Sequence, residues 1–278
     1  MLQMVTRIQN QEKRLQRLRP TQLINAEKAI KVLEPPDNLM EFIPAVSPQL
    51  VSPLHLQPIV SLLEKAHLEP LRVAFHVPPQ HYKSSTVLHA VAYWLKQKLG
   101  LSILYGTYNQ TQANHQILKA QTYLERVGFT PDPRMANIKD YQLLEGGNIH
   151  ARGREVGFTG LKGDIIALDD LYKNRAEASS PAVRKDTEDF FTDVVQTRTH
   201  EASSIIVFFT RWDENDLIGY IAKNFPEFQI IRIPALADGM DALGKNSAPD
   251  PVGREMGEPL LPHVKSKETL EKLRDNPA

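Results

Sequence analysis

Cysteine is absent from the 278-residue sequence, which excludes disulfide bonds, thiolate metal ligands and a cysteine nucleophile within this chain. An excess of either charge is absent as well, because 33 basic residues balance 33 acidic ones. A neutral chain has no overall field that draws in nucleic acid, so any contact with DNA must depend on local patches. The nine histidines show no metal-ligand spacing, and we expect no zinc site.

Long apolar runs are missing too. Stretches such as SSIIVFF (203–209) are much shorter than the roughly 20 apolar residues that cross a bilayer. The N-terminal segment has no continuous apolar stretch of the kind found in secretory signal peptides. The sequence therefore predicts a cytosolic chain that does not contact a membrane.

Short β-rich runs alternate with helical patterns from residue 50 onward. Strands are predicted over 71–77, 101–108, 163–170, 203–211 and 228–233, and helices over 84–98, 110–126, 182–195 and a short segment ending at Asn224. The strands are continuously apolar, which is typical of parallel sheets covered by helices on both faces. We therefore predict a three-layer α/β/α fold with a mostly parallel central sheet.

The flanking segments differ from this core, which we place at residues 49–235. Residues 1–48 are predicted to form an N-terminal arm, helical at first and then extended and proline-rich. Residues 130–160 carry glycine turns and predict an inserted hairpin. Residues 236–278, rich in glycine, proline and aspartate, predict a linker.

Polar residues follow the predicted strands at the point where each one ends. These residues are the loop containing Lys83, then Thr107 and Asn109, then Asp169 and Asp170, then Thr210 and Arg211. Open parallel sheets bind ligands at the carboxyl ends of their strands. We therefore expect these side chains to form one site.

The stretch HVPPQHYKSS (76–85) joins the first strand to the next helix and ends in Lys-Ser, like a phosphate-binding loop of the form G-x-x-x-x-G-K-[ST]. Val77 and Tyr82 stand where that form has glycine. Lys83 supplies positive charge, Ser84 a hydroxyl for a metal, and the following helix a positive end. The residues predicted to contact phosphate are Gln80, His81, Tyr82, Lys83, Ser84 and Ser85. The alternative is an ordinary strand-to-helix turn.

Tyr82 decides whether this loop can work without its glycine. Its ring must point away from the phosphates, and a positive φ would cost of the order of 1–2 kcal/mol in a non-glycine residue. A packed loop can carry that cost. A degenerate loop that no longer binds nucleotide is the alternative.

IIALDD (165–170) is typical of the magnesium strand of an NTPase. Asp169 is predicted to hold the metal through water, and Asp170 to orient and deprotonate the attacking water. Glu177 is the second candidate for the base. The alternative is that the two aspartates cap the following segment.

Two further groups complete the candidate site. Thr210, in FFTRW, is placed to sense the γ-phosphate, although a plain polar strand exit is the alternative reading. Arg152, Arg154 and Lys162 on the predicted insert could stabilise transition-state charge in this subunit or in a neighbour, or be ordinary surface charges.

Three motifs together resemble a known family. PPQHYKSS (78–85), GLKGDIIALDDLYKN (160–174) and FFTRWDENDLIG (208–219) are similar, in this order, to motifs of the ATPase domain of the tailed-bacteriophage terminase large subunit. The resemblance covers about residues 50–235. It implies an ASCE-type P-loop NTPase fold, ATP and Mg²⁺ as cofactors, and a motor that moves double-stranded DNA into a procapsid. It also implies a portal protein and a small terminase subunit as partners, a homo-oligomeric ring, and a location at the procapsid in the host-cell cytoplasm.

The resemblance assigns roles to individual residues. Lys83, Ser84 and Ser85 would bind phosphate and metal, Asp169 would hold magnesium, Asp170 would be the catalytic carboxylate, and Thr210 would belong to the coupling motif. His55 and Gln57 lie where the family has its adenine-side segment.

This sequence also departs from the family pattern. Tyr82 replaces a glycine, and Gln80 occupies a position that often carries arginine, so a loop arginine is missing. Relatives continue into a nuclease domain, towards which residues 236–278 are expected to lead, and we expect no nuclease site here. A helicase-like ATPase of the same fold and a non-catalytic regulatory module are the other candidate functions.

Overall fold

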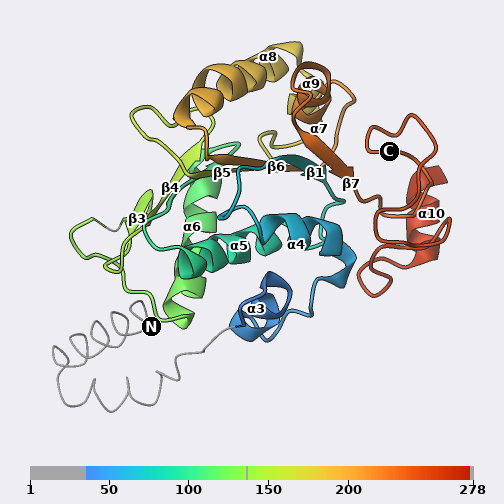
Figure 1. Ribbon diagram of the computed structural model, residues 1–278. Coiled ribbons are helices and arrows are strands. Elements are labelled where there is room, and N and C mark those ends of the chain that lie inside the picture. Colours follow the sequence, from blue (N-terminus) through green and yellow to red (C-terminus); the bar gives the residue numbers. More distant parts are fainter. Residues whose placement is uncertain (1–35, 136, 276–278) are drawn as a thin grey trace.

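The computed structural model describes residues 36–135 and 137–275. In this part of the chain, strands form one sheet in the order β3-β4-β2-β5-β6-β1-β7 (Figure 1). They are β1 (Arg72–His76), β2 (Ser102–Thr107), β3 (Asp140–Gln142), β4 (Asn148–Gly153), β5 (Ile165–Asp169), β6 (Ser204–Phe209) and β7 (Gln229–Arg232). Neighbouring strands are parallel except for β3 and β4, which are antiparallel.

Helices cover both faces of the sheet (Figure 1). One layer contains α3 (Leu39–Val46), α4 (Gln57–Leu63), α5 (Lys83–Gln97) and α6 (Gln110–Arg126), and the other contains α7 (Arg175–Ser179), α8 (Pro181–Asp189) and α9 (Leu217–Asn224). A short 3₁₀ turn at Leu54–Leu56 precedes α4, and a π-helical turn at Phe190–Val195 extends α8. Each face has its own apolar cluster. The predicted three-layer α/β/α fold is confirmed.

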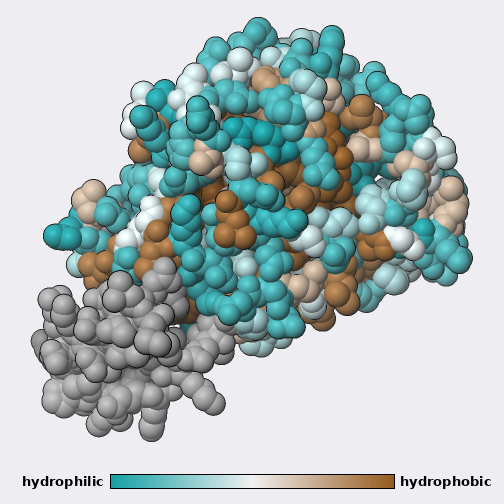
Figure 2. Space-filling view, viewed as in Figure 1, coloured by the Kyte–Doolittle hydropathy of each residue, from teal (hydrophilic) through white to brown (hydrophobic). Residues whose placement is uncertain are grey.

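The two central strands β5 and β6 are buried at every position. Each has a partner strand on both sides and a helical layer on both faces, so neither face of the strand meets water. This burial explains why both segments are continuously apolar in sequence instead of alternating. At the surface, Figure 2 shows mostly hydrophilic residues on the face in view, with smaller hydrophobic areas between them.

The segment before the core is not the extended connector that its prolines predict. Residues 1–35 of the predicted arm lie outside the described residues, but α3 follows directly and packs Phe42 and Ile43 into the core. Asn38 caps this helix by accepting a hydrogen bond from the Glu41 backbone at 2.9 Å. Pro44 lies inside the helix and donates no hydrogen bond. The helix forms because its apolar face is buried, which outweighs the cost of the proline.

The predicted inserted hairpin is part of the central sheet. β3 and β4 form the expected antiparallel pair, but β4 also pairs in parallel with β2 over residues 148–153. The segment therefore extends the sheet at one edge. A local turn pattern predicts the pairing of neighbouring strands but not the pairing of β4 with a strand far away in sequence.

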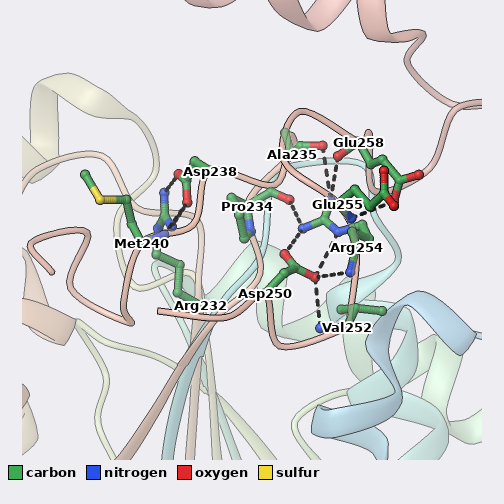
Figure 3. Close-up of polar contacts among 10 residues, drawn as sticks. All are labelled: Arg232, Pro234, Ala235, Asp238, Met240, Asp250, Val252, Arg254, Glu255 and Glu258. Carbon is green, nitrogen blue, oxygen red and sulfur yellow. Dashed lines mark hydrogen bonds and ion pairs between the residues drawn. The ribbon is translucent and has the colours of Figure 1, made fainter. Parts of the chain in front are cut away.

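Residues 236–275, predicted as a linker, pack against the β7 side of the sheet and end in α10 (Lys267–Asp275) (Figure 1). Arg254 organises this segment: it pairs at 2.8 Å with Asp250, whose side chain is buried, and donates to the carbonyls of Pro234 and Glu258 (Figure 3). The His76 ring, at the end of β1, donates to the Ala242 carbonyl at 3.0 Å. The boundary of the core at residue 235 remains a prediction, but the segment that follows it is folded.

Within the described residues, no helix combines the length and the apolar composition that crossing a membrane requires.

Candidate functional site

Five of the residues predicted from the sequence meet at one edge of the sheet. Lys83 and Ser84 are the first residues of α5, Asp169 ends β5, Asp170 follows it, and Thr210 follows β6. Since β6 lies between β1 and β5 and all three strands are parallel, their carboxyl ends lie next to one another.

An ion pair joins the loop to the second aspartate. The Lys83 ammonium contacts a carboxylate oxygen of Asp170 and lies 4.0 Å from the nearer oxygen of Asp169. The other oxygen of Asp170 accepts a hydrogen bond from the Thr210 backbone at 2.7 Å. Asp170 therefore connects the predicted phosphate-binding loop to the end of β6.

The first aspartate is held by two hydroxyl groups. One oxygen of Asp169 accepts from Ser84 at 2.9 Å, and the other accepts from Tyr105 on β2 at 2.7 Å. Burial raises the pKa of Asp169 to about 6, and the neighbouring Asp170 carboxylate adds to this, while the Lys83 charge opposes it. The charged form of a carboxylate that is this deeply buried is stabilised when a cation approaches.

The loop adopts the backbone conformation that glycine normally provides. Gln80 has φ of 68° and Tyr82 has φ of 63°, both in the left-handed region. Tyr82 directly precedes α5, in the position where a phosphate-binding loop has glycine. Its ring lies edge-on to His55, with the ring centroids 6.1 Å apart. The substituted loop therefore keeps the left-handed turn, and the tyrosine ring packs against a neighbouring element.

Two histidines hold the predicted phosphate-binding loop through hydrogen bonds to its backbone carbonyls. The His81 side chain is buried and donates to the Pro79 carbonyl at 2.9 Å. The His55 ring donates to the His81 carbonyl at 3.2 Å. Burial lowers the pKa of both histidines, so both favour the neutral form. Gln57, the other adenine-side candidate, is exposed and donates to Ser61 on its own helix at 3.0 Å.

The turn after β6 is held together by Arg211. Its guanidinium lies 2.8 Å from a carboxylate oxygen of the fully buried Asp216 and donates to the Glu214 carbonyl at 3.1 Å. Asp216 also caps α9 through the Gly219 backbone at 3.2 Å. A side chain at Gly219 would lie 2.0 Å from the Glu214 carbonyl oxygen, so only glycine fits. This explains the spacing of the arginine, aspartate and glycine in the third motif.

The predicted charge-stabilising residues lie outside the Lys83 cluster. Arg152 pairs with Asp140 at 2.5 Å on the edge strands. Arg154 donates to the Thr187 hydroxyl on α8 and lies 4.0 Å from a carboxylate oxygen of Glu177. Both arginines therefore make contacts within their own chain.

Lys162, Glu177 and Ser85 have local environments as well. Lys162 is exposed, and its carbonyl accepts a hydrogen bond from Ser102 at 2.8 Å. The Glu177 carboxylate accepts from the Lys173 backbone at 3.0 Å in the turn before α7. The Ser85 carbonyl accepts from the His89 ring at 2.7 Å.

Tyr105 is the member of the cluster that sequence reasoning missed. It lies within the apolar strand SILYGT, where a tyrosine is also an ordinary core residue. The only signal was its hydroxyl group, which needs a partner when buried.

The donor atoms present fit a hard divalent cation. Ser84 and Asp169 offer a hydroxyl and a carboxylate oxygen at the start of α5, and magnesium prefers oxygen ligands. Within the described part of the chain, no group of three or more His, Cys, Asp or Glu side chains could hold a metal ion. Magnesium commonly takes several of its ligands from water and substrate phosphate.

The sequence matches no protein-family model, and it matches no curated protein. Its structure, however, is similar to the large terminase of bacteriophage HK97, with a TM-score of 0.54 over 87% of this chain and 52% of that one, at 15% identity. The chain has the fold of a phage large terminase.

Two more terminase structures resemble it less well. One is the large terminase of a thermophilic bacteriophage, with a TM-score of 0.42 and 8% identity over 62% of this chain and 43% of that one. The other is a point mutant of the large terminase ATPase domain of Thermus phage P74-26, with a TM-score of 0.44 and 13% identity over 76% and 85%. The similarity to the HK97 structure confirms the terminase resemblance of the three motifs at the level of the fold. The chain spans about half the length of the HK97 terminase.

Proposed function

We propose that this chain is the ATP-hydrolysing motor domain of a viral terminase large subunit, which drives double-stranded DNA into a procapsid. One observation carries the proposal: Lys83, Ser84, Asp169, Asp170 and Thr210 meet at a single edge of a sheet whose fold is that of the HK97 large terminase. Motif order alone predicts neither the ion pair nor the hydroxyl contact between these residues.

Phosphate binding follows from the start of α5. We expect Lys83 and the backbone N–H groups of residues 80–85 to bind the phosphates at the start of α5, where the positive end of the helix adds to the attraction. A γ-phosphate would compete with Asp170 for the Lys83 ammonium. Binding of ATP therefore releases one oxygen of Asp170, which then orients and deprotonates the attacking water.

Ser84 and Asp169 would hold magnesium, which supplies positive charge to the phosphates when it is bound. The raised pKa of Asp169 has a second consequence. Because burial disfavours its charged form, this carboxylate is stabilised most when a cation is near. Metal and nucleotide binding should therefore support each other.

Thr210 connects hydrolysis to motion. Its backbone N–H donates to Asp170, so a movement of that carboxylate changes or breaks a hydrogen bond at the end of β6. Arg211 and Asp216 then tie this point to the start of α9. Release of the Asp170–Lys83 pair is thus coupled to α9 through a short chain of contacts.

The partners follow from the proposed role. They are double-stranded DNA, a portal protein, a small terminase subunit and further copies of this chain in a ring, at the procapsid in the host-cell cytoplasm. The large terminase fold supports this assembly, and the neutral charge of the chain requires that DNA contact come from local patches.

Calorimetric titration of ATP with and without magnesium tests the proposal. We expect magnesium-dependent binding by the parent chain and by a control variant, Lys223→Ala, which removes an exposed lysine of α9. Lys83→Ala should abolish it. If the parent chain does not bind ATP at any magnesium concentration, the motor proposal is wrong.

A further inference from the structure

The side chain of Tyr105 lies next to the proposed metal site but belongs to none of the three motifs. It is on β2, and its hydroxyl donates to Asp169 at 2.7 Å. Both residues are almost completely buried. The tyrosine is therefore a hydrogen-bond donor to the first aspartate.

The two oxygens of Asp169 are held in different ways. Ser84 contacts one oxygen from the start of α5, where its hydroxyl can turn about a single bond towards a metal. Tyr105 contacts the other oxygen from β2, where its backbone lies between Ala151 of β4 and Ala167 of β5 in the strand register. Its ring packs edge-on against Phe208 of β6, with centroids 6.3 Å apart. Tyr105 is thus fixed, while Ser84 is free to change partner.

We propose that Tyr105 is a positioning residue that orients the Asp169 carboxylate for magnesium. Its hydroxyl donates to one carboxylate oxygen of Asp169, so the other oxygen, which accepts from Ser84, faces the start of α5. It also offsets part of the cost of keeping a negative charge on a buried carboxylate. This inference rests on the proposed function, because it assigns Tyr105 a role at the same metal site.

Groups behind a metal ligand typically affect metal affinity by about 10- to 100-fold when they are removed. Tyr105→Phe deletes the hydroxyl and keeps the ring that packs against Phe208. The matched control is Tyr93→Phe, which removes the hydroxyl of another buried tyrosine. That hydroxyl lies away from the site and donates to the Asp37 carbonyl, with 2.8 Å between the two oxygens. Loss of a buried hydroxyl is common to both variants, and only one of them contacts Asp169.

The readout is the magnesium concentration that gives half-maximal binding of adenylyl imidodiphosphate, measured by calorimetry beside the thermal midpoint. For Tyr105→Phe we expect this concentration to rise about 10- to 100-fold, with binding of the nucleotide without metal unchanged. For Tyr93→Phe we expect the magnesium requirement of the parent. A lowered thermal midpoint with an unchanged magnesium requirement in Tyr105→Phe would mean that Tyr105 only packs, and the inference would be wrong.

A double variant keeps the test decisive if Tyr105→Phe alone does not fold. Tyr105→Phe combined with Asp169→Asn removes the buried charge together with its donor, so we expect this pair to fold. Its magnesium requirement should equal that of Asp169→Asn alone, because Tyr105 acts through Asp169. A further rise in the double variant would overturn the inference. If instead the parent chain binds no magnesium nucleotide, the proposed function itself fails, and the positioning role fails with it.

Discussion

Lys83 and Asp170 form an ion pair between the start of α5 and the end of β5, with the lysine side chain almost fully buried and the aspartate about one-third exposed. The residue proposed to bind phosphate is thus neutralised by the residue proposed to be the base. An incoming phosphate has to replace the carboxylate at the lysine. We infer that Asp170 is restrained until the nucleotide binds.

Replacing Lys83 by alanine should abolish ATP binding or hydrolysis. The substitution removes the only lysine or arginine of residues 76–85 and leaves Asp170 without its charged partner. Steady-state ATPase assays beside the Lys223→Ala control measure the effect. Activity that survives unchanged would show that the site has been placed wrongly.

The two aspartates should differ in what they contribute. Asp170→Asn is expected to keep nucleotide binding and to lower the turnover rate by roughly two orders of magnitude or more, because an amide cannot accept the proton of the attacking water. Asp169→Asn should instead raise the magnesium concentration needed for activity.

Glu177→Gln is the comparison variant for the base. Its carboxylate accepts a backbone hydrogen bond in the turn before α7 and lies near Arg154, so we expect a small effect on turnover. A large loss in Glu177→Gln combined with a small loss in Asp170→Asn would transfer the role of base to Glu177.

Tyr82→Gly tests the substituted loop. Glycine takes the left-handed conformation of this position without strain, which favours the folded state by about 1 kcal/mol, while the loss of the contact with His55 works against it. We expect nucleotide affinity within about tenfold of the parent, which corresponds to about 1.4 kcal/mol. Calorimetry measures the affinity. A variant that binds ATP where the parent does not would favour a non-catalytic regulatory module.

Activity should depend on assembly, because Gln80 leaves the loop without an arginine. An arginine supplied by a neighbouring subunit can contribute roughly 10³- to 10⁵-fold in rate. We expect specific activity to rise with protein concentration, and mixing Asp170→Asn with Arg152→Ala or Arg154→Ala shows whether either arginine is the donor. Restored activity identifies it.

The contacts of these arginines define the control for that experiment. Arg154 holds Thr187 on α8, so Arg154→Ala should also lower the thermal midpoint. Failure to restore activity on mixing, with activity independent of concentration, would contradict the role of a neighbouring arginine.

Folding stability should fall in mild acid because of buried histidines. Burial lowers the pKa of His76 and of His89 to about 4. Both are therefore neutral in the folded chain between pH 6.5 and about 4, whereas the unfolded chain takes up protons below 6.5. Their contribution to the free energy of unfolding is complete above pH 6.5 and is lost as the pH falls to 4. By pH 5 the loss is roughly 2 kcal/mol per histidine.

Thermal unfolding of the parent and of His89→Gln at pH 7.5 and pH 5 measures this effect. The drop in thermal midpoint should be smaller in the variant, because one titrating group has been removed. Asp169 acts in the opposite direction, since its raised pKa makes the folded chain bind a proton more readily below pH 6. The comparison of the two chains is therefore the test. An equal drop in both would contradict the role of His89.

Local sequence determined most of the sheet. Continuous apolar runs predict β1, β2, β5, β6 and β7, because a strand that is buried on both faces is apolar at successive positions. Helical patterns predict α5, α6 and α9. The same reasoning places Lys83, Asp169 and Thr210 at one edge, since parallel strands that alternate with helices all end on the same side. The three motifs add the terminase resemblance, which the fold confirms.

Contacts between residues far apart in sequence were decided only by the tertiary structure. Strand order sets Tyr105 beside Asp169 and gives β4 a place in the sheet, and no local pattern contains that order. The proline-rich segment before the core becomes α3, and the glycine-rich tail folds around Arg254, because each finds a surface that covers its apolar or charged groups. Tyr82 adopts a positive φ for the same reason: α5 and His55 hold it in a conformation that its own propensity disfavours.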